Sequence, residues 1–236
     1  MKEVTPMPTR YDRSAAQNAR QAILDSLNRF WKPADLDTAP STAQHLLAEL
    51  VNQGELRHLR RGLYWRGLKT PLGMAPPQPD LLAAELAGVP GIGPAGLSAA
   101  NALQLSTQIP RRGEYAIPAR PPADYELVRF ANRSARRGRA DAALTPIEVA
   151  ALEVLDRWDQ VIEASPDAAM TRLTELIDAG RLDAERLAEA SDTEPASVRA
   201  RLRHLLQRTG HTELADKVRR PDRRTAERAL TGLTRT

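Results

Sequence analysis

A short arginine-rich stretch, GELRHLRRGLYWRG at residues 54–67, has the composition of a phosphate-binding hairpin. Apolar residues recur on both sides of Gly62, which predicts two strands joined by a tight turn. Guanidinium groups donate paired hydrogen bonds to phosphate oxygens, so arginines on such a hairpin suit a nucleic-acid backbone. The arginines that we expect to face phosphates are Arg57, Arg60, Arg61 and Arg66. Contacts of this kind supply affinity without sequence preference.

The segment STAQHLLAELVNQG at 41–54 predicts an amphipathic helix directly before this hairpin. Its apolar stripe, spaced i, i+3, i+4 and i+7, consists of Ala43, Leu46, Leu47 and Leu50. The start of the opposite face carries the hydrogen-bonding residues Ser41, Thr42, Gln44 and His45. Because a glutamine can pair with adenine through two hydrogen bonds, Gln44 is the strongest candidate for reading DNA sequence. The alternative for Ser41 is a helix N-cap, and the alternative for His45 is an ordinary surface imidazole.

Two further helical segments complete a winged helix-turn-helix pattern over residues 1–70. The apolar spacing predicts a first helix from Ser14 to Trp31, and Pro33 suits the first turn of a short second helix. Three helices and a hairpin are typical of a winged helix-turn-helix, in which the third helix enters the major groove and the wing lies along the phosphate backbone. The sequence therefore predicts a DNA-binding domain. The alternative is a winged helix that serves only as a protein-contact domain.

The remainder of the chain predicts a second, mainly helical α+β domain. A proline-rich stretch, TPLGMAPPQPD, separates the two, and we place the linker at 71–80 and the second domain at 81–216. The spans GEYAIP and YELVRFANRS predict the two strands of a hairpin, and helical patterns follow them. The fold class expected for the chain is mainly α with small β. We expect the basic tail, 217–236, to be disordered.

Charge is unevenly distributed along the second domain. Residues 111–139 hold eight arginines against three acidic residues, a net charge of +5, whereas residues 141–190 hold four arginines against twelve acidic residues, a net charge of −8. Carboxylates can serve acid–base catalysis or metal binding, but these lack the His-x-x-x-His and Asp-x-Asp spacings of such sites. We expect them to lie on solvated helix faces, and we expect no enzyme activity, no metal and no cofactor.

The hexapeptide GIGPAG at 91–96 matches the G-x-G-x-x-G pattern of a dinucleotide-binding turn. That turn requires a preceding hydrophobic strand and a parallel βαβ unit, whereas here an alanine-rich helical segment comes before Gly91. The glycines are better explained by a turn into a helix from Ala95 to Leu105, whose small residues allow close packing. We therefore expect no dinucleotide to bind.

The winged helix ending in RRGLYWRG, followed by GPAGLSAANALQLSTQIP and a short strand pair, resembles the AbiEi-type antitoxins of type IV toxin–antitoxin systems. The resemblance covers about residues 20–135 with recognisable motifs and extends more loosely to about residue 210. It implies a protein that represses its own operon by binding double-stranded DNA at an operator with inverted repeats, as a dimer on that DNA. It also implies that the protein counters a nucleotidyltransferase toxin, either by direct contact or only functionally.

The residues of this resemblance that we assign to the antitoxin role are Asn101, Ser106, Thr107 and Gln108. Gln104 stands where the resemblance leads us to expect a glycine. The alternative for the four polar residues is a network that closes a turn between a helix and a strand. Two functional alternatives stay open: a transcriptional regulator without an antitoxin role, and an antitoxin that binds the toxin directly through the basic segment 111–139 and the acidic helices.

The overall composition excludes several other classes of protein. The 236 residues include no cysteine, which excludes disulfides, thiolate metal sites and cysteine nucleophiles. The first residues, MKEVTPMPTR, lack the apolar core of a signal peptide, and no stretch approaches the roughly 20 apolar residues that span a bilayer. We therefore expect a cytoplasmic protein with no membrane contact. The formal net charge of +4 suits an anionic partner such as DNA.

Overall fold

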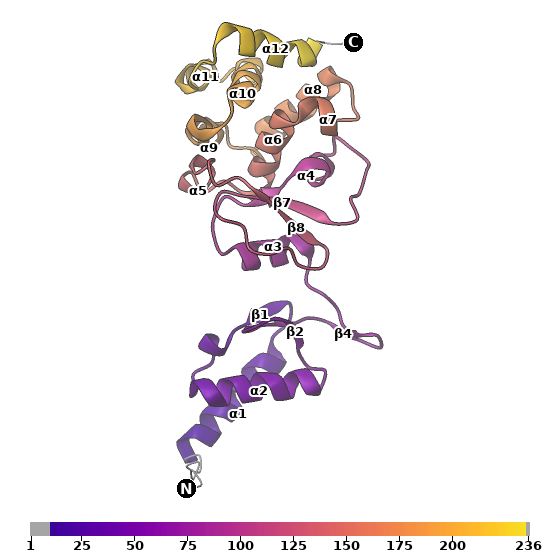
Figure 1. The fold of residues 1–236 in the computed structure, drawn as a ribbon, viewed down its shortest axis with the longest axis vertical. Coiled ribbons are helices and arrows are strands. Elements are labelled where there is room, and N and C mark those ends of the chain that lie inside the picture. The colour runs from indigo at the N-terminus through magenta and orange to yellow at the C-terminus, as the bar shows by residue number, and fades with distance from the viewer. Residues whose placement is uncertain (1–9, 235–236) are drawn as a thin grey trace. The chain divides into compact units, whose positions relative to one another are not determined.

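The chain folds into two compact units, which divide between Gln78 and Pro79, inside the segment 71–80 expected to link two domains. The structure is a computed structural model that describes residues 10–234, with side chains from 14 to 233. Helices dominate and the strands form small sheets, so the predicted fold class is confirmed (Figure 1).

The first unit has the order of elements found in a winged helix. Its elements are α1 (Arg10–Asp25), β1 (Arg29–Trp31), the 3₁₀ turn η1 (Pro33–Asp35), α2 (Pro40–Asn52), β2 (Arg57–Arg60), β3 (Leu63–Arg66), β4 (Lys69–Thr70) and β5 (Gly73–Met74). Strands β1, β3 and β2 form an antiparallel sheet in that order, and β4 pairs with β5. The helix–strand–helix–strand arrangement is consistent with the predicted winged helix. The hairpin β4–β5 shows that the first part of the expected linker is folded.

Helix α2 turns its apolar stripe into the core of this unit, as the spacing predicts. Ala43, Leu47 and Leu50 have no exposed surface, and Leu46 is 6% exposed. These residues share one apolar cluster with Ile23 of α1. Because the stripe is buried, the residues between its members face solvent, and they include the polar residues considered for DNA contact.

The first helix is shorter than predicted. It ends at Asp25, and Trp31, which we expected on that helix, lies in β1 and pairs with Tyr64 of β3. Between them Asn28 adopts a left-handed backbone with φ of 54°, a conformation that asparagine tolerates better than most residues and that breaks a helix. Trp31 is still buried, and its indole N–H donates to the hydroxyl of Ser26 at 3.0 Å. Trp31 fits both the apolar face of a helix and a buried position in a strand, so its spacing alone could not distinguish the two.

The second unit is built around one buried helix, α6. Its elements are α3 (Pro79–Ala87), β6 (Gly93–Pro94), α4 (Gly96–Ala102), β7 (Gly113–Ile117), β8 (Val128–Asn132), α5 (Gly138–Asp141), α6 (Pro146–Asp156), α7 (Trp158–Val161), α8 (Pro166–Asp178), α9 (Ala184–Ala190), the 3₁₀ turn η2 (Ser191–Thr193), α10 (Ala196–Arg208), α11 (Thr212–Lys217) and α12 (Arg223–Thr234). Every residue of α6 from Glu148 to Leu155 is buried. Helices α4 and α10 and strand β6 all pack against α6, which explains this complete burial.

The predicted hairpin in this unit is wrong, because β7 and β8 pair in parallel. The register runs from Gly113 opposite Val128 to Ile117 opposite Asn132. The connection between the strands returns the chain to the end of the sheet at which β7 began, and it is fixed there by Asp124, which accepts a hydrogen bond from the N–H of Phe130 at 3.0 Å. Strand β6 pairs antiparallel to β7 on its other side. The apolar pattern identified both strands but could not give their direction.

The basic tail is folded as far as the structure describes it, to residue 234, contrary to our expectation. Helix α12 packs on α10 and α8, as Figure 1 shows for its yellow ribbon beside α10. Ala229 and Leu233 of α12 are buried, and the carbonyl of Ala229 accepts a hydrogen bond from Arg201 Nε at 3.1 Å. Ala226, Ala229, Leu230 and Leu233 have the i, i+3, i+4, i+7 spacing of a buried helix face. That spacing predicts a packed helix, but the many arginines of the segment led us to expect disorder.

The glycines of GIGPAG serve close packing. A Cβ on Gly91 would collide with the backbone of Arg139, and a Cβ on Gly93 would lie 2.5 Å from the carbonyl oxygen of Pro146 and 2.7 Å from Val149. Helix α3 precedes this segment, and β6 pairs antiparallel to β7. The surroundings are therefore those of a tight packing corner, and they differ from the βαβ unit that a dinucleotide turn requires.

Candidate nucleic-acid interface

The first turns of α2 expose the residues considered for reading DNA bases. Ser41, Gln44 and His45 are exposed, and Thr42 is partly exposed. The N-cap alternative for Ser41 is wrong, because Ala39 is the N-cap and Pro40 occupies the first helical position, where its missing N–H leaves no donor unsatisfied. The hydroxyl of Ser41 is thus not used to cap the helix. Helix α2 presents a short-chained polar surface at its N-terminal end.

The turn of the β2–β3 hairpin presents two arginines to solvent. Gly62 has φ of 74°, a left-handed conformation that suits glycine and allows the tight turn after Arg60 and Arg61. Both arginines are exposed, while Leu59 and Leu63 beside them are buried. Within the described residues, the guanidinium groups of Arg60 and Arg61 have no acidic partner. They are therefore available to an anionic ligand.

Arg66, unlike Arg60 and Arg61, is bound within the domain, so the prediction that it contacts a phosphate needs correction. Its side chain is 15% exposed, lies 3.4 Å from the carboxylate of Glu55 and donates to the carbonyl of Leu24 at 3.4 Å. A hydrogen bond from Lys69 and the nearby charges of Lys69 and Arg66 hold the pKa of Glu55 below its ordinary value, against the opposing effect of burial. Arg66 thus joins the hairpin to α1 within the domain. Arg57, on β2, is partly buried.

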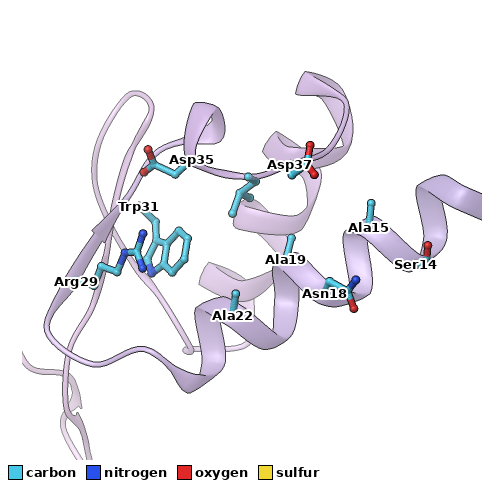
Figure 2. Close-up of a pocket in the computed structure, with 10 residues that line it drawn as sticks. Ser14, Ala15, Asn18, Ala19, Ala22, Arg29, Trp31, Asp35 and Asp37 are labelled. Atoms are coloured by element: carbon cyan, nitrogen blue, oxygen red, sulfur yellow. The ribbon is translucent and has the colours of Figure 1, made fainter.

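A hollow of about 450 Å³ lies between α1 and the β1–η1 segment of the first unit (Figure 2). On one side Arg29 stacks over the ring of Trp31, with 4.1 Å from the guanidinium carbon to the ring centroid. Asp35, beside Trp31, and Asp37 contribute carboxylates, and Asn18 projects from α1. Two carboxylates repel phosphate groups, so this hollow is excluded from the candidate interface. The predicted first helix covers both Arg29 and Trp31, so their stacking at β1 was not predicted.

In the second unit, the four polar residues assigned to the antitoxin role form a network around Glu163. The carboxylate of Glu163 accepts from the N–H of Thr107 at 2.8 Å, from the hydroxyl of Thr107 at 3.1 Å and from Gln108 Nε2 at 2.6 Å. Asn101 donates to the carbonyl of Ser106 at 3.3 Å, and the hydroxyl of Ser106 accepts from the N–H of Gln108 at 3.1 Å. The hydrogen bonds that Glu163 itself accepts, first from the Thr107 N–H and then from Gln108 and the Thr107 hydroxyl, lower its pKa. The arrangement matches the alternative in which these residues close a turn after α4. Glu163 was not predicted as their partner because it lies far from them in the sequence.

Gln104 provides a test of that turn. It has φ of 62°, and Leu105 N–H donates to the carbonyl of Ala100 at 2.8 Å, the bond of a helix end that favours glycine. We predict that Gln104→Gly raises the free energy of unfolding by about 0.5–1 kcal/mol, because the left-handed strain removed exceeds the added chain entropy. Urea unfolding would measure the change. Gln104→Ala keeps a Cβ and should give no gain, and an equal gain from both variants would contradict the explanation.

The oppositely charged segments of the second unit pair with each other inside it. Arg139 and Glu194 have fully buried side chains, joined by hydrogen bonds of 2.6 Å and 2.9 Å, and Arg139 also donates to buried Glu153 at 2.7 Å. Arg133 and Arg136 bind the same Glu153 carboxylate, at 2.8 Å and 3.1 Å. The prediction that the carboxylates lie on solvated faces is therefore wrong for these acids. It is also wrong for Glu148, whose side chain is buried and bound by Arg186 at 2.7 Å.

This network predicts an acid-sensitive fold. Burial alone would raise the pKa of Glu153, but the hydrogen bond from Arg133 and the charges of Arg139, Arg133 and Arg136 outweigh it and lower the pKa. A carboxyl whose pKa is lower in the folded state stabilises the fold fully above its ordinary value, about 4.5, and loses that contribution as the pH falls through the folded value. The free energy of unfolding should therefore drop below about pH 4.5, and drop less in Glu153→Gln. A rise in stability on acidification would contradict this.

The fold and this surface define the class of protein as a mainly helical chain whose first unit is consistent with a winged helix and exposes a polar helix face and a basic turn. No family model matches the chain, and no curated protein does. Among solved structures, the crystal structure of the RV2827C protein from Mycobacterium tuberculosis is similar, with a TM-score of 0.45 and 20% sequence identity, covering 87% of this chain and 80% of that chain.

Within the described part of the chain, no three His, Asp or Glu side chains are grouped so that they could hold a metal ion. Among the helices described there, none is long and apolar enough to cross a membrane.

Proposed function

We propose that the protein is a DNA-binding repressor of its own operon, of the AbiEi antitoxin type. The observation that carries the proposal is the pairing, in one winged-helix unit, of an exposed polar face on α2 with an exposed, unpaired Arg60-Arg61 turn. A helix of this kind fits the major groove, where base edges are distinguishable, and a basic hairpin turn fits the adjacent phosphates. The resemblance described above adds an operator with inverted repeats, bound by two copies of the chain.

The base-reading role of Gln44 gives a prediction. Gln44→Ala should reduce discrimination at one operator position by about 1–3 kcal/mol, because an amide can make two hydrogen bonds to adenine that alanine cannot. Affinity for random DNA should change little. Binding measured on a set of operators with single base changes would show the loss of preference.

Asn52→Ala serves as the matched control, since Asn52 is exposed at the other end of α2. We expect its base preferences to equal those of the wild type. If Gln44→Ala keeps the full preference at every position, or if Asn52→Ala loses it, then α2 does not enter the groove by its N-terminal end.

The antitoxin activity is the second part of the proposal, and two routes remain open for it. Arg133, Arg136 and Arg139 are engaged inside the second unit, so a direct contact with a toxin could use only the exposed part of the basic segment. The polar residues around Glu163 are likewise engaged in closing their own turn. Because these residues are already bound within the unit, we favour neutralisation of the toxin without a stable complex over direct binding of the toxin by the whole basic segment.

Co-expression with a nucleotidyltransferase toxin separates the two routes. Rescue of growth with no complex detected on size-exclusion chromatography supports the functional route, and a stable complex supports direct contact. If no rescue occurs with a toxin from the same operon while operator binding persists, the protein is a regulator without an antitoxin role.

A further inference from the structure

Two arginines of the second unit differ from those around them. Arg133, Arg136, Arg139 and Arg201, which are buried or mostly buried, each contact carboxylates or carbonyl oxygens. Arg157, at the end of α6, is also partly buried, yet within the described residues its guanidinium makes no hydrogen bond or ion pair, and the same holds for Arg129 on β8. Arg129 is exposed and Arg157 is half-buried, so an anionic ligand can reach both guanidinium groups. Both groups can therefore bind an anion without first breaking an ion pair within the described part of the chain.

Both arginines open into one hollow of about 410 Å³, which Arg112 also lines. Glu114 is the one carboxylate among the lining residues, and Arg112 has a long ion pair of 3.8 Å with Asp124 outside it. A Cβ built on Gly96 would lie 3.0 Å from Glu114 Oε2 and 3.6 Å from Arg157 Nη1, so a glycine keeps this floor open. Three guanidinium groups against one carboxylate give the hollow a positive charge that suits phosphate groups.

A second hollow of about 440 Å³ adjoins the first, since both are lined by Ser98 and Pro110. Its lining is mainly apolar and includes Ile109 and Leu127, which are 84% and 55% exposed. Exposed apolar side chains at a hollow are typical of a binding site. Because a cationic hollow and an apolar hollow lie side by side, the pair matches a ligand with phosphates at one end and a flat, poorly hydrated group at the other.

We propose that these adjoining hollows bind a mononucleotide, with its phosphates held by Arg112, Arg129 and Arg157 and its base against Ile109 and Leu127. Each hollow falls in the 300–1,000 Å³ range typical of ligand sites. In this proposal arginine side chains hold the phosphates. Of the glycines in GIGPAG only Gly96 borders the hollow, and it contributes by having no side chain to fill the space. The site would make the second unit responsive to nucleotides independently of operator binding by the first.

Calorimetric titration of the full chain tests the site, with ATP, GTP, CTP, UTP and inorganic pyrophosphate as probes. We expect at least one nucleotide to bind with one site per chain and pyrophosphate to compete with it. Arg129→Ala with Arg157→Gln should lower both affinities at least tenfold. Ile109→Ser should weaken nucleotide binding several-fold and leave pyrophosphate binding unchanged. Arg120→Ala removes an exposed arginine outside the hollow and should behave as wild type.

Several outcomes would overturn the proposal. Absence of binding by all the probes would do so, as would an equal loss of affinity in Arg120→Ala. Unchanged nucleotide affinity in Ile109→Ser would refute the placement of the base. If no nucleotide binds but the double variant weakens DNA binding, the arginines contact backbone phosphates of DNA and the nucleotide site is refuted. Arg129→Ala alone, an exposed substitution, keeps the test valid if the double variant fails to fold.

Discussion

Arg139→Leu is expected to lower the free energy of unfolding by about 3–5 kcal/mol, the range found when one partner of a buried ion pair is removed. The guanidinium of Arg139 is fully buried and binds two carboxylates that are also fully buried. Its loss leaves Glu194 with one remaining ion pair, to Arg136 at 3.4 Å, and Glu153 with the pairs to Arg133 and Arg136. Most of the cost should therefore fall on Glu194, which becomes a poorly compensated charge inside the protein.

Chemical denaturation followed by circular dichroism would measure this loss. Arg137→Leu removes an exposed arginine two residues earlier in the chain, and its effect should stay within about 0.5 kcal/mol. Adding Glu194→Leu to Arg139→Leu should recover part of the stability, because an apolar pair can replace a buried ion pair. A loss below about 1 kcal/mol for Arg139→Leu, or further destabilisation by the second substitution, would show that the network does not hold the fold together.

The double variant Arg60→Ala/Arg61→Ala is expected to weaken DNA binding about thirtyfold, and by a similar factor on all sequences. Each arginine lost from a phosphate contact should cost at least about 1 kcal/mol, and two such losses multiply. The slope of log K against log salt should become shallower by about 1.8, because each neutralised phosphate contributes about 0.9. Fluorescence anisotropy at several salt concentrations, on operator and random DNA, would measure both quantities.

Arg60→Lys/Arg61→Lys is the matched control. It keeps both charges, so the salt slope should stay near that of the wild type, while the loss of the planar guanidinium lowers affinity by a smaller factor. An unchanged salt slope in the alanine variant would mean that the hairpin turn does not touch DNA phosphates. A loss confined to the operator would mean that these arginines read bases.

Helix α2 and the β2–β3 hairpin were predictable from the sequence, because apolar spacing and turn residues indicated the same element in each. The stripe of Leu46, Leu47 and Leu50 gave the position and the buried face of α2, and Gly62 gave the hairpin turn. Local chemistry sufficed for both, because each depends on neighbours within a few residues. The exposure of Gln44 and of the Arg60-Arg61 turn followed from these elements.

The errors concern contacts between residues far apart in the sequence. The parallel direction of β7 and β8 depends on how the connecting loop returns, which apolar alternation does not encode. Glu153 looked like a surface acid until Arg133 and Arg139 were found beside it in space. Arg66 looked like a member of the basic hairpin, but Glu55 and the carbonyl of Leu24 hold it inside the domain. Composition reports how many charges a segment has, and pairing across the fold decides which remain free.

The packing of α12 onto α10 has a consequence for how the chain folds during synthesis. The first unit has its own apolar cluster, which includes Ile23 and Leu47, so it can close as soon as it leaves the ribosome. The second unit must wait for Ala229 and Leu233, which cover α10 from the far end of the unit. Until these residues emerge, the first unit would already be folded while the second unit still exposes part of its apolar interior.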